Sequence, residues 1–174
     1  MNFHTHDLTA PMPAIMNMPQ EWLLHPEVVQ LRDDATYSVG IHPWWTADAA
    51  WEDLKEGFYL WAQHPQVVRI GECGLDKLKG ATIDVQEQAF LIHVNLSEQL
   101  QKPLTIHCVK AFDRLLALHK QLRPTQCWAI HGFRGKPELA QQLLAAGCDL
   151  SFGTLYNEAA FNLCPPDRRC RETD

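Results

Sequence analysis

Short apolar segments typical of β-strands alternate with amphipathic, helix-like segments along the whole sequence. The strand-like segments end at seven positions, which are His6, His42, Glu72, His107, His131, Gly153 and Asp174. Successive ends lie about 28 residues apart on average, the length of one strand–helix unit. Such repeats form parallel sheets with right-handed crossovers. No Gly-x-Gly-x-x-Gly motif follows the first strand-like segment, so the pattern favours a barrel over a dinucleotide-binding fold.

The helix-like segments carry apolar side chains on one face. From Thr46, a suitable N-cap, apolar residues recur at helical spacing as far as Trp61, and Pro65 ends the helix. The same reasoning predicts further helices over 84–100, 112–122, 137–146 and 157–163. Residues 9–26 contain four prolines, and we predict a long loop there.

The length of the chain limits how much of a barrel it can form. A complete eightfold β/α barrel takes about 250 residues and seldom fewer than 200, whereas this chain has 174. We therefore predict an α/β protein with an incomplete TIM-type β/α barrel. About seven parallel strands are expected, with the eighth βα unit missing, and residues 1–174 are expected to form a single domain.

Composition excludes several classes of protein. The net charge of −6 argues against a broadly basic surface that binds nucleic acid by counterion release. No apolar run approaches the roughly 18 residues of a membrane span, and the first residues do not resemble a signal peptide. The six cysteines form no C-x-x-C pair, and several lie in strand-like runs. Reduced, mostly buried cysteines are typical of a cytoplasmic protein, and we predict that location.

Residue types that bind metal ions stand at the carboxyl ends of four strand-like segments, at His6, Glu72, His107 and His131. In a parallel barrel these ends meet on one face, where active sites are found. His4 and His6 are two residues apart, so on a strand they point to the same side and can bind one cation. A single histidine of this kind is more often structural, but the repetition in register favours a metal site. Imidazoles with carboxylates suit Zn²⁺, Mn²⁺ or Mg²⁺.

In order along the chain, these motifs resemble the signatures of TatD-type metal-dependent deoxyribonucleases, a family of the amidohydrolase-like superfamily. The matching segments are 2–8, 39–43, 70–76, 103–108, 130–135 and 172–174. The resemblance implies a hydrolase that cleaves phosphodiester bonds in DNA with two divalent metal ions. It also implies the ligands, with His4, His6 and Asp174 on the first ion, His107 and His131 on the second, and Glu72 bridging both. Glu72 and Asp174 are the implied catalytic residues, and Asp174 could act as general base.

Other residues near these motifs are candidates for substrate binding. His42 ends a strand on the same face, and Lys110 and Arg134 each follow a predicted ligand by three residues, where they could contact phosphate or remain solvated loop charges. Trp44 or Trp45 could stack on a base, and Asp76 could orient a metal ligand or cap its loop. The remaining histidines are expected to be structural, namely His25, His64, His93 and His119.

The sequence departs from the family pattern at its end. The segment 167–171 contains three arginines where related proteins have an apolar strand. Since buried, unpaired arginines are costly, we expect an exposed edge strand and a loosely held Asp174. Two alternatives to a deoxyribonuclease follow: a metal-dependent hydrolase of a small-molecule amide, ester or phosphoester, favoured by the acidic net charge, and a truncated metal-binding fragment with little activity. No specific protein partner can be identified.

Overall fold

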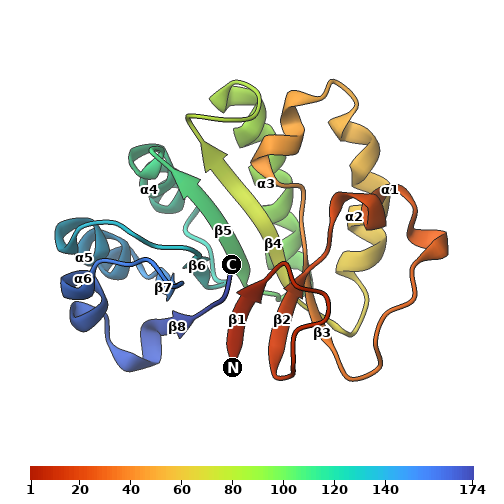
Figure 1. Cartoon of the computed structure of the whole chain (residues 1–174). Coiled ribbons are helices and arrows are strands. Elements are labelled where there is room, and N and C mark those ends of the chain that lie inside the picture. The colour runs from red at the N-terminus through yellow and green to blue at the C-terminus, as the bar shows by residue number, and fades with distance from the viewer.

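The computed structural model describes residues 1–174, and its centre is one parallel sheet of eight strands (Figure 1). The strands pair in sequence order, so each new strand is added beside the previous one. Their bounds are β1 Asn2–Thr5, β2 Ala14–Asn17, β3 Thr36–Val39, β4 Val67–Asp76, β5 Leu104–Val109, β6 Trp128–Ile130, β7 Asp149–Phe152 and β8 Arg169–Arg171. Because all strands are parallel, their carboxyl ends share one face.

The sheet curls until its last strand lies beside its first. Directly after β8, the backbone N–H of Thr173 donates to the carbonyl oxygen of His4 at 3.3 Å. The side chains of Asn2 and Thr173 form two further hydrogen bonds, of 2.7 and 3.1 Å. Figure 1 shows β1 and β8 side by side, with the C-terminus above β1. The predicted TIM-type β/α barrel is therefore confirmed.

The predicted strand count is wrong, because the sheet contains eight strands rather than seven. The unpredicted strand is β2, within the proposed loop over 9–26. All four of its residues are buried, and it pairs with both β1 and β3. Four residues are too few to show an alternating pattern, and the prolines at 13 and 19 flank the strand without interrupting its hydrogen bonds. The strand expected to be the last of seven is β8.

Helices cover the outside of the sheet (Figure 1). They are α1 Gln20–Leu24, α2 Leu54–Ala62, α3 Ile83–Leu100, α4 Phe112–Leu122, α5 Pro137–Ala146 and α6 Glu158–Leu163, with 3-10 turns at Pro26–Val28, Pro43–Ala47, Trp51–Asp53 and Pro166–Arg168. The helix expected from Thr46 begins only at Leu54, because Pro43 starts a separate 3-10 turn and a second turn follows at Trp51. No helix is both long enough and apolar enough to span a membrane.

The arginines of the last strand have partners, and the expected exposed edge is not present. β8 pairs with β7 on one side, and the residue that follows it bonds to β1 on the other. Arg168 forms an ion pair with Asp149. The guanidinium groups of Arg169 and Arg171 lie 4.0 and 4.1 Å from the centroid of the Phe161 ring in α6. Cation–π contact with α6 therefore replaces the apolar packing that the sequence lacks.

Candidate metal centre

The structure brings all six predicted ligands, together with His42, to the carboxyl face of the barrel. They come from segments far apart in the sequence, namely β1 and the residue after it, the loop after β3, the middle of β4, β5, the residue after β6 and the residue two beyond Glu172. His4, His42, Glu72 and His131 are buried, while His6 and Asp174 remain exposed to solvent. This clustering follows from parallel strand order, as the sequence predicted.

Glu72 is the centre of this cluster, and its two carboxylate oxygens face different histidines. Oε2 lies 3.4 Å from His4 Nε2 and 3.2 Å from His6 Nε2. Oε1 lies 3.0 Å from His42 Nε2, 2.9 Å from His107 Nδ1 and 2.7 Å from His131 Nε2. A carboxylate that is divided between two sets of nitrogen donors has the arrangement that a bridging ligand requires.

Asn17, at the end of β2, fixes the backbone of Glu72. Its side-chain oxygen accepts the Glu72 backbone N–H at 2.9 Å and the Ser38 hydroxyl at 3.0 Å. Asn17 is only 3% exposed, so these bonds are shielded from water. The sequence analysis missed this residue because β2 was predicted as loop, and only the buried run of 14–17 could have indicated it.

Asp174 extends the cluster toward solvent. Its Oδ1 lies 3.3 Å from His6 Nε2 and 3.7 Å from His4 Nε2, and its Oδ2 lies 3.9 Å from His131 Nδ1. The preceding residue, Thr173, is tied to β1 by the bonds described above and by a 3.2 Å hydrogen bond from the Thr5 hydroxyl to its carbonyl oxygen. Asp174 is thus attached to the first strand through its neighbour, contrary to the expectation of a loose end.

Two further carboxylates stand behind the histidines. Asp76 Oδ2 accepts the indole N–H of Trp44 at 2.7 Å and the Nε2–H of His107 at 3.1 Å. With the proton on Nε2, the lone pair of His107 Nδ1 points at Glu72, which is the arrangement usual for metal-binding histidines. Burial alone would raise the pKa of Asp76, but the hydrogen bonds from Trp44, Leu78 and His107 outweigh it and lower that pKa. The structure thus gives Asp76 the orienting role that the sequence suggested.

Glu172 plays a similar part for His131. Its side chain is fully buried and lies 3.6 Å from His131 Nδ1. The same oxygen accepts the Gly132 backbone N–H at 2.7 Å. Sequence reasoning counted this residue only as part of a motif, because nothing in the order of residues shows that it faces the loop after β6.

The electrostatics of the cluster favour negative charge on Glu72 and positive charge around it. Burial would raise the pKa of Glu72, but His131, His107 and His4 outweigh burial and hold that pKa well below its ordinary value. His131 is also buried, which would lower its pKa, yet Glu72 and Glu172 raise it to about 10. His42 differs, since burial lowers its pKa despite the hydrogen bond with Glu72.

The donor set fits a divalent cation. Ligand atoms about 2.1 Å from a tetrahedral zinc ion are roughly 3.4 Å apart, close to the 3.4 and 3.7 Å that separate His4 Nε2 from Glu72 and Asp174. His4 Nε2 is buried and has no hydrogen-bond partner, a costly state that a cation would relieve. Three groups of ligand atoms lie within 4.8 Å of one another: His4, His6 and Glu72; His4, His131 and Asp174; and His42, Glu72 and His107.

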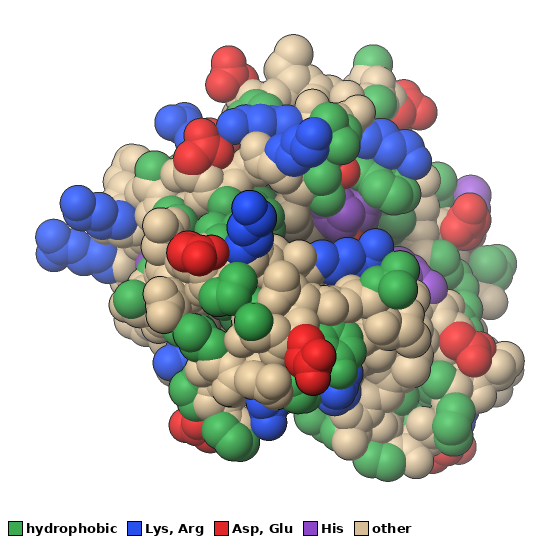
Figure 2. All heavy atoms as spheres, turned by 60° about the vertical axis from the view of Figure 1, so that its left-hand side comes forward, with side chains coloured by type: hydrophobic (Ala, Val, Ile, Leu, Met, Phe, Trp, Pro, Cys, Tyr) green, Lys and Arg blue, Asp and Glu red, His purple; other side chains and the backbone are tan.

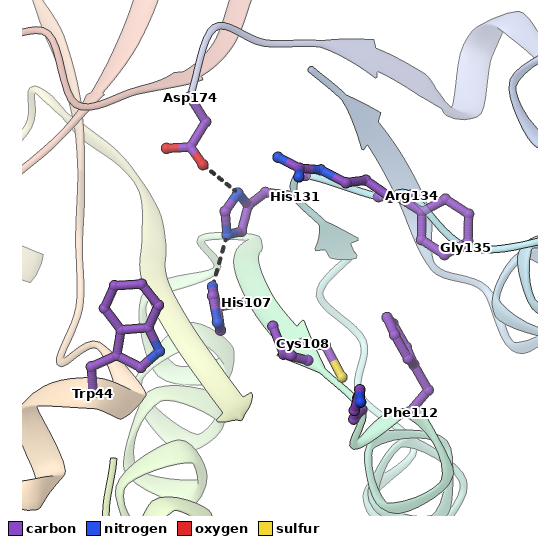
Figure 3. A pocket seen from close by; sticks show the side chains of 12 residues that line it. Trp44, His107, Cys108, Phe112, His131, Arg134, Gly135 and Asp174 are labelled. Carbon is purple, nitrogen blue, oxygen red and sulfur yellow. Dashed lines mark hydrogen bonds and ion pairs between the residues drawn. The ribbon is translucent and has the colours of Figure 1, made fainter. Parts of the chain in front are cut away.

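The cluster lies at the junction of two pockets, which together form one cleft. The first has a volume of about 480 Å³ and lies against β5, β6 and the loops that follow them (Figure 3). The second, of about 460 Å³, lies against the ends of β1, β2 and β3. Lys110 and Arg134 both line the first pocket, and Figure 3 shows the Arg134 side chain extending toward His131 and Asp174. In Figure 2, histidine side chains lie in a hollow flanked by lysine and arginine side chains.

A β/α barrel with histidines and carboxylates gathered at the carboxyl ends of its strands belongs to the class of metal-dependent hydrolases. Residues 11–174 match the family described as TatD related DNase. The chain therefore belongs to that family, and the resemblance drawn from its motifs is confirmed.

Relatives with described names agree with this assignment. The chain is 34% identical over 149 residues to the 3′-5′ ssDNA/RNA exonuclease TatD of Klebsiella pneumoniae, a match covering 79% of this chain and 56% of the relative. It is 30% identical over 158 residues to the uncharacterized metal-dependent hydrolase YcfH of Escherichia coli, covering 85% of this chain and 58% of the relative. The chain thus spans little more than half the length of these relatives.

Solved structures confirm the fold. The TatD homologue YjjV of Escherichia coli superimposes with a TM-score of 0.72 at 22% identity, covering 92% of this chain and 66% of that chain. A TatD-family hydrolase of Entamoeba histolytica gives a TM-score of 0.66 at 21% identity and covers 92% of this chain and 60% of that chain.

Proposed function

We propose that the chain hydrolyses phosphodiester bonds in nucleic acid, with DNA as the principal substrate, and that it uses two divalent metal ions. The observation that carries this proposal is the division of the Glu72 oxygens between His4 and His6 on one side and His107 and His131 on the other. In this proposal residues 1–174 act as one hydrolase domain.

The ligands follow from the positions of their donor atoms. His4, His6 and Asp174 would hold the first ion, His107 and His131 the second, and Glu72 would bridge them. A mixed set of imidazoles and carboxylates suits Mn²⁺ or Zn²⁺, and Mg²⁺ where water completes the coordination. When bound, a pair of such ions lowers the pKa of water and stabilises the charge that develops on the phosphate oxygens.

The side chains of the protein supply the remaining functions. Asp174 lines both pockets and is about one-third exposed, so its carboxylate can accept a proton from an incoming water molecule. His42 accepts the Trp44 backbone N–H at Nδ1, at 3.1 Å, so its Nε2–H donates to Glu72. It thus holds the carboxylate in place, in addition to the contact with substrate that we proposed for it. Lys110 and Arg134 would bind phosphate.

The substrate class is supported by the relatives and by local charge. The TatD relatives are named as exonucleases of single-stranded DNA and RNA. Lys110 and Arg134 give the first pocket a positive charge that the chain as a whole lacks. A small neutral substrate would make no use of these side chains, so a polyanion is favoured over a small-molecule ester or amide.

Turnover of single-stranded DNA with Mg²⁺ or Mn²⁺ tests the proposal. We expect Glu72→Gln, which keeps the shape of the side chain, to lower kcat/KM by about 100-fold or more. Asp33→Asn, which removes an exposed carboxylate elsewhere, should leave it unchanged. Full activity in Glu72→Gln would rule out the mechanism. If the wild type cleaves a small phosphoester but no oligonucleotide, the small-molecule alternative is correct, and fewer than two metal ions per chain would favour the weakly active fragment.

The cytoplasm remains the proposed location. Burial raises the pKa of Cys108 and Cys148 to about 12. Such thiols behave as small apolar packing residues, which is usual in a reducing compartment.

A further inference from the structure

The two pockets that meet at the metal centre differ in charge. They share Trp44, His107, His131 and Asp174. We call the first the cationic lobe; its own residues include Lys110 and Arg134 and no carboxylate. We call the second the polar lobe; its own residues include Glu21, which is exposed, and neither lysine nor arginine. The cleft is therefore asymmetric on either side of the site where hydrolysis is proposed.

The cationic lobe also offers an aromatic surface. Phe112 is partly exposed in this lobe and packs edge-to-face on Phe133, with ring centroids 6.2 Å apart. Cys108 and Val109 add apolar surface beside it. Aromatic side chains next to cations are the combination that binds single-stranded nucleic acid, because bases stack on the rings while phosphates meet the charges.

Trp44 forms a fixed wall between the lobes. Its indole N–H is held by Asp76, and the ammonium group of Lys79 lies 3.5 Å from the centroid of its ring. One face of the ring is thus occupied by a cation. A base that stacked on that face would have to displace Lys79, so Trp44 is better suited to separating the two lobes than to binding a base there.

From this asymmetry we infer the direction in which a nucleic-acid strand lies in the cleft. The 5′ portion of the strand, with its repeated phosphates, occupies the cationic lobe, and the terminal 3′ nucleotide that is released occupies the polar lobe. The reason is electrostatic. Each further phosphate gains from Lys110 and Arg134 on one side, whereas a phosphate on the other side would face Glu21. This inference rests on the proposed nuclease function and adds to it a specific basis for cleavage from a strand end.

Substrate length provides the first test. In Lys110→Ala/Arg134→Ala, we expect KM for an octanucleotide to rise about tenfold, while KM for a dinucleotide, which has only the scissile phosphate, stays unchanged. The slope of log KM against log salt should fall by about 1.4 for the octanucleotide, at roughly 0.7 for each phosphate that the protein no longer neutralises. The control variant Lys120→Ala/Arg123→Ala removes two cations at the far end of α4 and should change neither value.

Binding without turnover gives a second readout of the same variants. Fluorescence anisotropy of a labelled octanucleotide in the presence of EDTA should show the same loss of affinity. An equal rise in KM for the dinucleotide and the octanucleotide would overturn the inference, since both cations would then contact the scissile phosphate. If the wild type does not cleave the dinucleotide or the octanucleotide at all, the proposed function itself fails.

The polar lobe is tested with a phosphate on the 3′ end of the strand. We expect this group to lower kcat/KM of the wild type by about threefold, the effect of unit charges roughly 8 Å apart in water. Glu21→Gln should remove most of this penalty. Glu27→Gln, in the neighbouring turn and outside the cleft, should retain it. A penalty that is the same in Glu21→Gln and the wild type would place the 3′ end elsewhere and overturn the inference.

Discussion

His93, a histidine outside the metal centre, should make the stability of the fold depend on pH. It lies in α3, is fully buried and packs on Phe58 with ring centroids 4.4 Å apart. Its Nε2 accepts the backbone N–H of Ile41 at 2.7 Å, and its Nδ1–H donates to the carbonyl oxygen of Ala89 at 2.7 Å. Both bonds require the neutral ring, and burial lowers the pKa of His93 from 6.5 to about 4. Ile41 precedes His42, so this bond also fixes one side of the metal centre.

The sign and size of the effect follow from this pKa. Between pH 6.5 and 4 the unfolded chain binds a proton at His93 that the folded chain does not bind, so stability falls as the pH is lowered. A shift of this size corresponds to a loss of about 2 kcal/mol at pH 5 and about 3 kcal/mol at pH 4, relative to pH 8. Above pH 6.5 both states are neutral at this position and no dependence is expected.

Comparison with His93→Gln isolates this contribution. Glutamine can still accept the Ile41 N–H but does not titrate, so the other ionisable groups cancel in the difference between the two proteins. Urea unfolding in the presence of EDTA, at several values between pH 4 and 8, gives the free energy of unfolding of each. The wild type should lose about 3 kcal/mol more than the variant over this range. Parallel curves for the two proteins would refute the reasoning.

Two further substitutions test other parts of the structure. Asp76→Asn should weaken Mn²⁺ or Zn²⁺ binding by about 10- to 100-fold in calorimetric titration, because His107 loses the acceptor that orients it; Trp44→Phe should have a smaller effect, and unchanged affinity in Asp76→Asn would show that His107 is oriented by other contacts. Gly57→Ala should lower the free energy of unfolding by about 2 kcal/mol in urea, although alanine favours helices, since its Cβ would lie 1.9 Å from the Leu23 carbonyl oxygen; equal stability would mean that α1 moves freely away from α2.

The ligand positions could be predicted from the sequence because of a simple property of parallel strands. Each apolar run of β4, β5 or the segment ending at His131 leads into a ligand, and parallel order brings these ends together. The prediction needed neither the register nor the helix boundaries. The TIM-type fold followed from the same alternation of elements, and its confirmation does not depend on the strand count that was wrong.

The features that the sequence did not reveal depend on contacts between distant segments. β2 has only four residues, and its strand character comes from pairing with two neighbours. The roles of Asn17 and Glu172 depend on which backbone N–H each faces across the barrel. The arginines of β8 were judged incompatible with a paired strand, because no pattern in the sequence indicates that the rings of α6 lie against them.

The seam of the barrel and the proposed metal centre occupy the same place. β1 and the residues after β8 are joined by one backbone hydrogen bond, from Thr173 to His4, and by the side chains of Asn2 and Thr5. The other neighbouring strands are joined by regular ladders. His4, at the seam, faces Asp174 on the other side at 3.7 Å. A cation held by both residues would therefore cross the seam where hydrogen bonds are fewest, so the ligands that serve catalysis would also hold the first and last strands together.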